Sequence, residues 1–142
     1  MRLQINPIKD IEDACKSNSF FTAFALASTY FEYEANLILG TRFENRISLE
    51  ILEKWNLQTK IRLLFGLDMV DRTTHDKISQ IIKIRNKLMH PVNIWENGRM
   101  RDIFLRYRLT EKEKSYLLSF NECYAKLVEA HSRTLAKKSR EE

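Results

Sequence analysis

Residues that end helices are scarce in this chain. Its 142 residues include only three glycines and two prolines, which are Gly40, Gly66, Gly98, Pro7 and Pro91. A β-sandwich or an α/β fold of this length would need more residues that suit tight turns. Since 44% of the residues are hydrophobic, the chain can bury a core, and its 30% of charged residues suit exposed helix faces. The sequence therefore predicts one all-α domain over residues 1–142.

Hydrophobic residues at helical spacing predict a bundle of four to five helices. A short helix is expected at about residues 8–16. A long helix should follow from Asn18 or Ser19 to about Leu39, with Gly40 as its end. Its hydrophobic stripe consists of Phe20, Phe24, Ala27, Phe31, Ala35 and Ile38.

Further helices are expected in the middle of the chain. One covers residues 47–55, with Ile51 among its inward-facing residues, and the next covers residues 57–65 and ends at Gly66. Another starts at Thr73 or Thr74 and is terminated by Pro91.

The final helix has a clear start signal. Thr110 and Glu113 have the spacing of a capping box. The hydrophobic face expected after it consists of Leu117, Phe120, Tyr124, Leu127, Val128 and Leu135. The charged residues at 136–142 should fray.

Residues 92–109 do not follow a helical pattern. Asn97-Gly98 is the strongest hairpin signal in the chain, and it is flanked by Ile94-Trp95 and by Ile103-Phe104. A loop or a small hairpin arm is therefore expected over residues 92–109.

The formal net charge of +5 is concentrated in one segment. Residues 81–108 contain seven basic and two acidic residues, so the whole excess lies there. Such a field attracts polyanions, although a solvated basic face without a ligand would look the same. The candidate nucleic-acid-binding residues of this segment are Lys83, Lys87, Arg99, Arg101, Arg106 and Arg108.

Other patterns point to a cytoplasmic protein without a metal or cofactor. Cys15 and Cys123 are far apart and lack the spacing of a zinc site or a disulfide framework. The polar residues 1–19 do not resemble a signal peptide, and the apolar stretch 20–31 is too short to span a bilayer. His75 and His131 are expected to be structural or surface residues.

One helix carries a polar constellation. Arg85 falls within the stripe that contains Ile78 and Ile82, while Asn86 and His90 are neighbours at i and i+4. A guanidinium in such a place needs a partner. Glu34, which also falls within a hydrophobic stripe, is the partner that we expect.

These residue types suit RNA cleavage. His90 would lie at a helix C-terminus, where the helix dipole favours the protonated ring, so it can act as an acid or a base. Arg85 could stabilise a phosphorane, and Asn86 could position the reacting groups. Attack by a 2′-hydroxyl on the adjacent phosphate needs no metal ion.

The string Ile84-Arg85-Asn86-Lys87-Leu88-Met89-His90-Pro91 resembles the signature of the HEPN superfamily, in which Arg and a polar residue precede His late in a helix. The helix at 57–67 is also similar to the one that precedes this motif in many members. The resemblance covers roughly residues 18–91. It implies a helical bundle, often a two-fold dimer whose Arg and His residues share one cleft, and metal-independent ribonuclease activity in toxin–antitoxin pairs, phage defence or RNA processing.

A second resemblance supports an alternative. Phe20-Phe21-Thr22-Ala23 and residues 60–67 are similar to segments of the mannitol operon repressor family, which are helical regulators. Many HEPN proteins are also non-catalytic. The alternative function is therefore a binding or regulatory module with a protein partner, such as an antitoxin, in which Arg85 and Glu34 form a structural ion pair.

Overall fold

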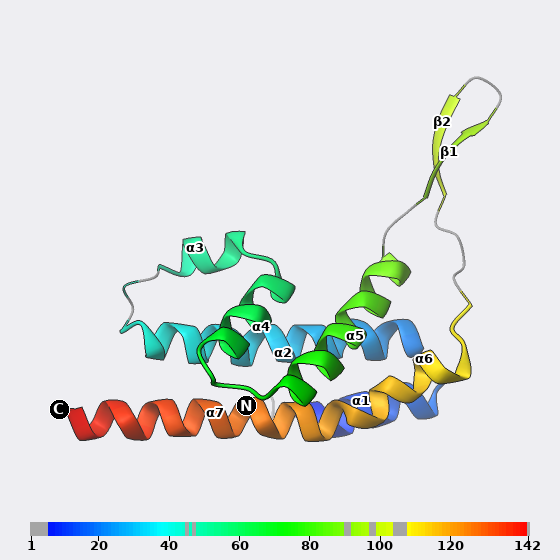
Figure 1. Cartoon of the computed structure of the whole chain (residues 1–142). Coiled ribbons are helices and arrows are strands. Elements are labelled where there is room, and N and C mark those ends of the chain that lie inside the picture. Colours follow the sequence, from blue (N-terminus) through cyan, green and yellow to red (C-terminus); the bar gives the residue numbers. More distant parts are fainter. Residues whose placement is uncertain are drawn as a thin grey trace, which may run out of the picture.

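The structure is a computed structural model, and it describes residues 6–44, 46, 48–89, 92–96, 99–103 and 108–141. Most of the described chain is helical, and the predicted all-α bundle is confirmed (Figure 1). Its helices are α1 (Pro7–Lys16), α2 (Phe20–Arg42), α3 (Leu49–Lys54), α4 (Leu57–Gly66), α5 (Arg72–Met89), α6 (Glu111–Ser115), the 3-10 helix η1 (Tyr116–Ser119) and α7 (Phe120–Glu141).

A two-stranded antiparallel hairpin follows α5. It consists of β1 (Val92–Glu96) and β2 (Arg99–Ile103), with Val92 opposite Ile103 and Glu96 opposite Arg99. Of the two structures expected within residues 92–109, a loop or a small hairpin arm, the described residues form the hairpin. The Asn97-Gly98 pair that predicted it lies outside the described residues.

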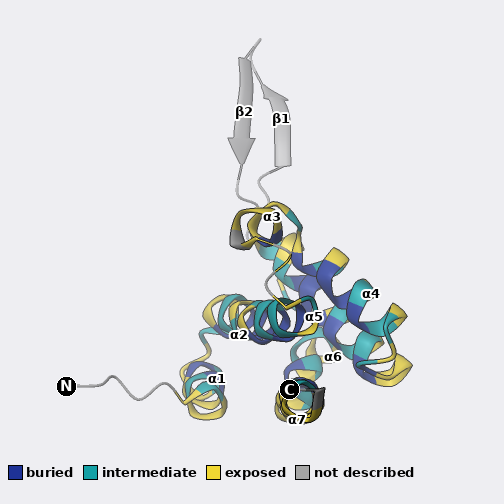
Figure 2. Ribbon diagram, turned by 90° about the vertical axis from the view of Figure 1, so that its left-hand side faces the viewer, coloured by how far each residue is buried: buried dark blue, intermediate teal, exposed yellow. Residues whose placement is uncertain are grey.

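Helix α2 is the centre of the bundle. It packs against α1, α4, α5 and α7, and Figure 2 shows it between α1 and α7 on one side and α4 and α5 on the other. Its predicted stripe is buried from Phe24 to Ile38, with Phe24 and Phe31 fully enclosed, and Phe20 at its start is partly buried. The other large side chains of the core are Ile38, Leu39, Ile61, Leu64, Ile78, Ile81, Phe120 and Leu127.

Of the two glycines expected to end helices, Gly66 is the last residue of α4 as predicted, whereas Gly40 does not end α2. Helix α2 continues through Gly40 to Arg42, and Glu44 adopts the left-handed backbone conformation with φ 52°. Helix α4 includes Gly66, and Asp68 is the left-handed residue. A single helical glycine costs only about 1 kcal/mol relative to alanine. Burial of the neighbouring Leu39 therefore keeps the helix intact around Gly40.

Other boundaries differ by smaller amounts. Helix α5 begins before the expected Thr73 or Thr74, because the Asp71 carboxylate caps it by accepting a hydrogen bond from the Thr74 amide at 2.7 Å. Helix α3 is shorter than predicted, and Ile51 is exposed although it was expected to face inward.

The last helical segment begins as predicted, but the buried face of α7 differs from the predicted one. The capping box of Thr110 and Glu113 is present. The 3-10 helix η1 then precedes α7. Cys123 and Ala130 are buried, while Val128 and Leu135 are exposed, contrary to the prediction. Helix α7 is helical to Glu141, through the segment expected to fray.

Both cysteines are free thiols, as the spacing predicts. Burial raises the pKa of Cys123 to about 11, and the pKa of the half-buried Cys15 is also raised, mainly by burial. Because the thiolate is the nucleophile, we expect iodoacetamide at pH 8 to label Cys15 slowly and Cys123 only when the chain unfolds. Mass spectrometry of native and urea-unfolded protein checks this order. Equal labelling of both thiols in the native state would contradict the burial of Cys123.

Within the described part of the chain, none of the helices combines the length and the apolar character that crossing a bilayer requires.

Candidate functional site

The predicted site lies on the last two turns of α5. Arg85 is half-buried, and Asn86 is exposed beside it. His90, the residue directly after the last described residue of α5, lies outside the described residues. Ile81 and Ile82 on the preceding turn are buried, so Arg85 continues the hydrophobic stripe at the end of α5, where its own side chain is only partly buried.

The Arg85 guanidinium is incompletely hydrogen-bonded. Its Nη1 lies 4.0 Å from the Met89 sulfur, and its Nε is buried without a hydrogen-bond partner among the described residues. Buried donors are nearly always paired with protein or ordered water. A guanidinium offers five donors in a planar fork that matches the oxygens of a phosphate. Arg85 is therefore a side chain with donors available for an anionic ligand.

The prediction that Arg85 and Glu34 form an ion pair is wrong. Glu34 is buried, but its Oε1 accepts a hydrogen bond from the Tyr124 hydroxyl at 3.3 Å, and its Oε2 lies 3.8 Å from Nδ1 of His131. Tyr124 and His131 belong to α7, which lies on a different side of α2 from α5 (Figure 2). The hydrophobic stripe of α2 correctly predicted that Glu34 faces inward. It could not predict which neighbouring helix Glu34 meets.

The other predicted nucleic-acid-binding residues are spread over several elements. Lys83, Lys87 and Arg108 are exposed. Arg99 and Arg101 lie on β2, opposite Glu96 and Ile94, and only the backbone of this strand is described. Arg106 lies outside the described residues.

A groove between α4 and α5 brings three predicted residues together. Its volume is about 680 Å³, and its lining residues are Gln58, Arg62, His75, Ser79, Gln80, Ile82, Lys83, Asn86 and Lys87. No carboxylate is among them. Arg62 was missed by the sequence prediction, because nothing in the pattern of residues 57–65 shows that their polar face meets α5.

Some charged groups next to the groove reduce its positive potential. Lys87 Nζ lies 3.8 Å from Glu113 Oε2. The carboxylate of Asp76 lies 2.9 Å from Nδ1 of His75. Arg62 and Lys83 are both exposed, and no ion pair of either with a described carboxylate is observed. These two side chains are the main source of positive charge in the groove.

A hydrogen bond between Tyr30 and Asp10 connects α2 with α1. The Tyr30 hydroxyl donates a hydrogen bond to Asp10 at 2.6 Å, and burial together with Asp10 raises the pKa of Tyr30 to about 12. The unfolded pKa is about 10. The folded state thus holds the proton more tightly, so this contribution is present below pH 10 and is lost as the pH rises towards 12. We expect stability to fall over this window, and to fall less in Tyr30→Phe.

Urea unfolding at pH 9, 10 and 11 measures this effect. If wild type and Tyr30→Phe lose stability equally over the window, the Tyr30–Asp10 contact has no role in it.

Among the described residues, no group of three or more His, Cys, Asp or Glu side chains is arranged to hold a metal ion. Comparison of the chain with protein-family models, with curated proteins and with solved structures found no match.

Proposed function

We propose that this protein is a HEPN-type endoribonuclease whose active site forms around the C-terminal end of α5. The observation that carries the proposal is the Arg85 guanidinium, which has an unpaired buried Nε, beside exposed Asn86 and five residues before His90. The nearby groove supplies further positive charge from Arg62 and Lys83. A polyanionic ligand fits this combination better than a neutral or cationic one.

The proposed chemistry is transfer of the RNA phosphate to the neighbouring 2′-oxygen. The 2′-hydroxyl attacks phosphorus, the bond from phosphorus to the 5′-oxygen breaks, and a 2′,3′-cyclic phosphate remains. His90 would take the proton from the 2′-hydroxyl or give one to the departing 5′-oxygen, and water would complete the other proton transfer. Arg85 would stabilise the charge of the phosphorane, and Asn86 would orient the scissile group. This reaction needs no metal ion.

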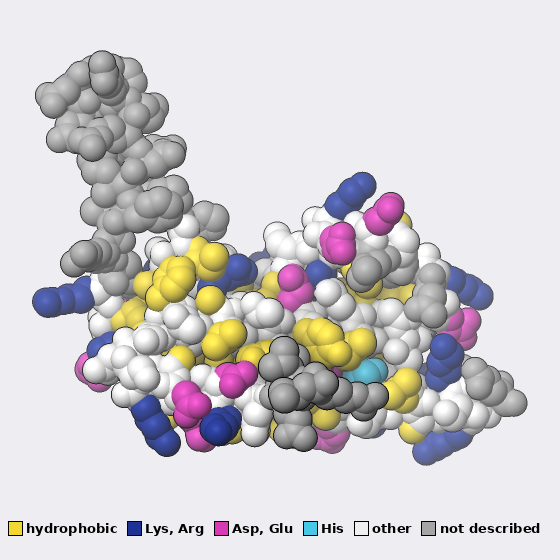
Figure 3. All heavy atoms as spheres, turned by 180° about the vertical axis from the view of Figure 1, so that it is seen from behind, with side chains coloured by type: hydrophobic (Ala, Val, Ile, Leu, Met, Phe, Trp, Pro, Cys, Tyr) yellow, Lys and Arg dark blue, Asp and Glu magenta, His cyan; other side chains and the backbone are white. Residues whose placement is uncertain are grey.

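A homodimer belongs to the proposal. Sharing one cleft between two copies would bring four catalytic side chains together without requiring Arg85 and His90 of one chain to meet. Large hydrophobic side chains are exposed on the bundle, including Phe21 and Tyr33 of α2. Hydrophobic patches lie among charged side chains on the face seen in Figure 3. Such patches commonly mark protein interfaces.

A second groove suits a protein partner, which the alternative of a non-catalytic module requires. Leu118 is 85% exposed, and it lies beside an apolar groove of about 480 Å³ that Ile11, Phe20 and Leu117 also line. An antitoxin or another protein could use this groove in either case. The discriminating property is therefore RNA cleavage and not the presence of a partner.

The test is cleavage of an end-labelled, mixed-sequence RNA in excess EDTA by wild type and by His90→Ala purified identically. We expect the wild type to cut and the variant to lose at least about 100-fold in rate, the usual scale of an acid or base. Equal cutting by both proteins would show a contaminant. Absence of cutting by the wild type would overturn the nuclease proposal and favour the binding module.

A further inference from the structure

We propose that the groove between α4 and α5 binds the sugar–phosphate backbone of single-stranded RNA, with Arg62 and Lys83 as its phosphate-binding residues. This inference rests on the proposed RNA-directed function. It adds a binding site that includes a residue of α4, outside both the Arg–His motif and the basic segment 81–108. It also gives the direction from which the strand reaches Arg85.

The groove follows one face of α5. His75, Ser79, Lys83 and Asn86 all line it, and they recur every three or four residues. At a rise of about 1.5 Å per residue, the eleven steps from His75 to Asn86 extend for about 16 Å. A strand in a nucleic-acid helix carries one phosphate per about 3.4 Å of axis, so a track of this length can contact several phosphates.

The opposite wall comes from α4. Gln58 and Arg62 are four residues apart and therefore lie on the same side of this helix. The Gln58 side-chain amide donates a hydrogen bond to the Ser79 hydroxyl at 3.0 Å, which joins the two walls. The fixed wall holds Arg62 on the same groove as Lys83, although the two residues come from different helices.

His75 marks the end of the groove that lies farthest from Asn86. Its ring packs on Phe65 at a centroid distance of 5.0 Å, and its Nδ1 lies 2.9 Å from the Asp76 carboxylate. Its Nε2 is buried without a hydrogen-bond partner among the described residues. An unpaired polar atom of this kind indicates a place where a ligand or water completes the bonding.

Charge favours an RNA strand over an acidic protein segment. The lining contains no carboxylate, and one end of it reaches Asn86 and Lys87, beside Arg85 and within the segment that holds the whole net charge of the chain. Phosphates at regular intervals match positive side chains that are distributed along a track. An acidic peptide would need only a local patch.

The test is binding of a fluorescein-labelled, 2′-O-methylated RNA of mixed sequence, which cannot be cut by 2′-hydroxyl attack. Anisotropy titrations from 50 to 300 mM salt compare wild type with Arg62→Ala/Lys83→Ala. Lys9→Ala/Lys16→Ala is the matched control, because it removes two exposed positive charges from α1, on the other side of α2 (Figure 2). Arg62→Gln/Lys83→Gln repeats the test with longer side chains if the first variant folds poorly by circular dichroism.

We expect the groove variant to bind at least about 10-fold more weakly at 100 mM salt, because each lost phosphate contact also removes its counterion release. The slope of log affinity against log salt should become shallower by about 1.4, or about 0.7 per single-strand phosphate contact. The α1 control should change affinity by less than about 2-fold. Lys9 and Lys16 lie outside the groove, so salt screens their attraction for the RNA phosphates. Equal weakening in both variants, or no binding by the wild type, would overturn the inference.

The two proposals can fail separately. If unmodified RNA is cut and the groove variant binds normally, the nuclease stands and the groove is wrong. If the wild type binds through the groove and cuts nothing, the groove stands and the nuclease is wrong.

Discussion

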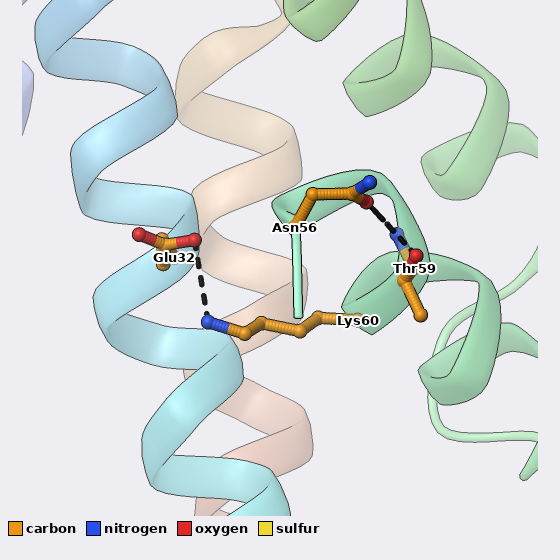
Figure 4. Close-up of polar contacts among 4 residues, drawn as sticks. All are labelled: Glu32, Asn56, Thr59 and Lys60. Carbon is orange, nitrogen blue, oxygen red and sulfur yellow. Dashed lines mark hydrogen bonds and ion pairs between the residues drawn. The ribbon is translucent and has the colours of Figure 1, made fainter. Parts of the chain in front are cut away.

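Replacing Glu32 by glutamine is expected to lower the free energy of unfolding by about 3 kcal/mol, the lower end of the cost of leaving a buried charge unpaired. Lys60 of α4 is 1% exposed, and its Nζ lies 3.3 Å from Oε2 of Glu32 on α2 (Figure 4). An ammonium so far from water depends on this carboxylate. The lower end applies because Glu32 itself is 45% exposed and water reaches it.

The capped start of α4 directs Lys60 into the interior. Asn56 caps α4 by accepting hydrogen bonds from the amide and the hydroxyl of Thr59, at 2.8 and 2.9 Å. The first turn of α4 is thereby fixed, and Lys60 in the next position extends towards α2 (Figure 4).

The substitution Lys60→Met distinguishes the effect of the buried charge on stability from the effect of side-chain packing. This variant removes the buried charge and keeps an apolar stem, so we expect a change in stability of less than about 1 kcal/mol, or a gain. Glu32→Gln/Lys60→Met should be as stable as Lys60→Met alone. Glu129→Gln, whose carboxylate is exposed and lies 3.9 Å from Arg133, is the surface control and should cost less than about 1 kcal/mol. Urea unfolding monitored by circular dichroism gives all four values, and equal losses for Glu32→Gln and Glu129→Gln would refute the account of Lys60.

Arg85→Ala is expected to slow RNA cleavage by at least about 100-fold, the usual loss on removing one donor that stabilises transition-state charge. Its effect on the free energy of unfolding should stay within about 1 kcal/mol, because Arg85 makes no ion pair with a described residue. Arg85→Lys keeps the charge but loses the planar fork, so an intermediate rate is expected.

Arg140→Ala is the matched control, because it removes one exposed arginine near the end of α7. Single-turnover rates with end-labelled RNA measure the loss, and urea unfolding measures stability. A loss of several kcal/mol in stability together with unchanged cleavage would instead assign Arg85 a structural role.

The sequence predicted the parts of the fold that depend on repeated local patterns. The stripe from Phe24 to Ile38 marked the central helix correctly, and the Thr110–Glu113 spacing marked a capping box. Helix ends were less accurate, because Gly40 is held in its helix by tertiary packing that a local rule does not include. The buried face of α7 was predicted incorrectly, because the side of this helix that packs on α2 depends on contacts that a local pattern does not include.

For the candidate site too, features that depend on local patterns were predicted, whereas contacts between helices were not. The hydrophobic pattern predicted that Arg85 and Asn86 lie late in a helix, which the structure confirms. It could not determine partners between helices. Glu34 therefore appeared to be the partner of Arg85, although it meets Tyr124 and His131. For the same reason, buried Lys60 and groove residue Arg62 were not predicted, since both appear as ordinary polar positions of α4 until the packing of that helix is known.

The most direct test of the central claim compares one RNA with its fully 2′-O-methylated copy, both end-labelled and incubated with wild-type protein in EDTA. The proposed chemistry uses the 2′-hydroxyl as the nucleophile. It therefore predicts that only the unmodified RNA is cut, leaving a 2′,3′-cyclic phosphate and a free 5′-hydroxyl. Cutting of the methylated copy, products with a 5′-phosphate, or no cutting of either RNA would contradict the claim.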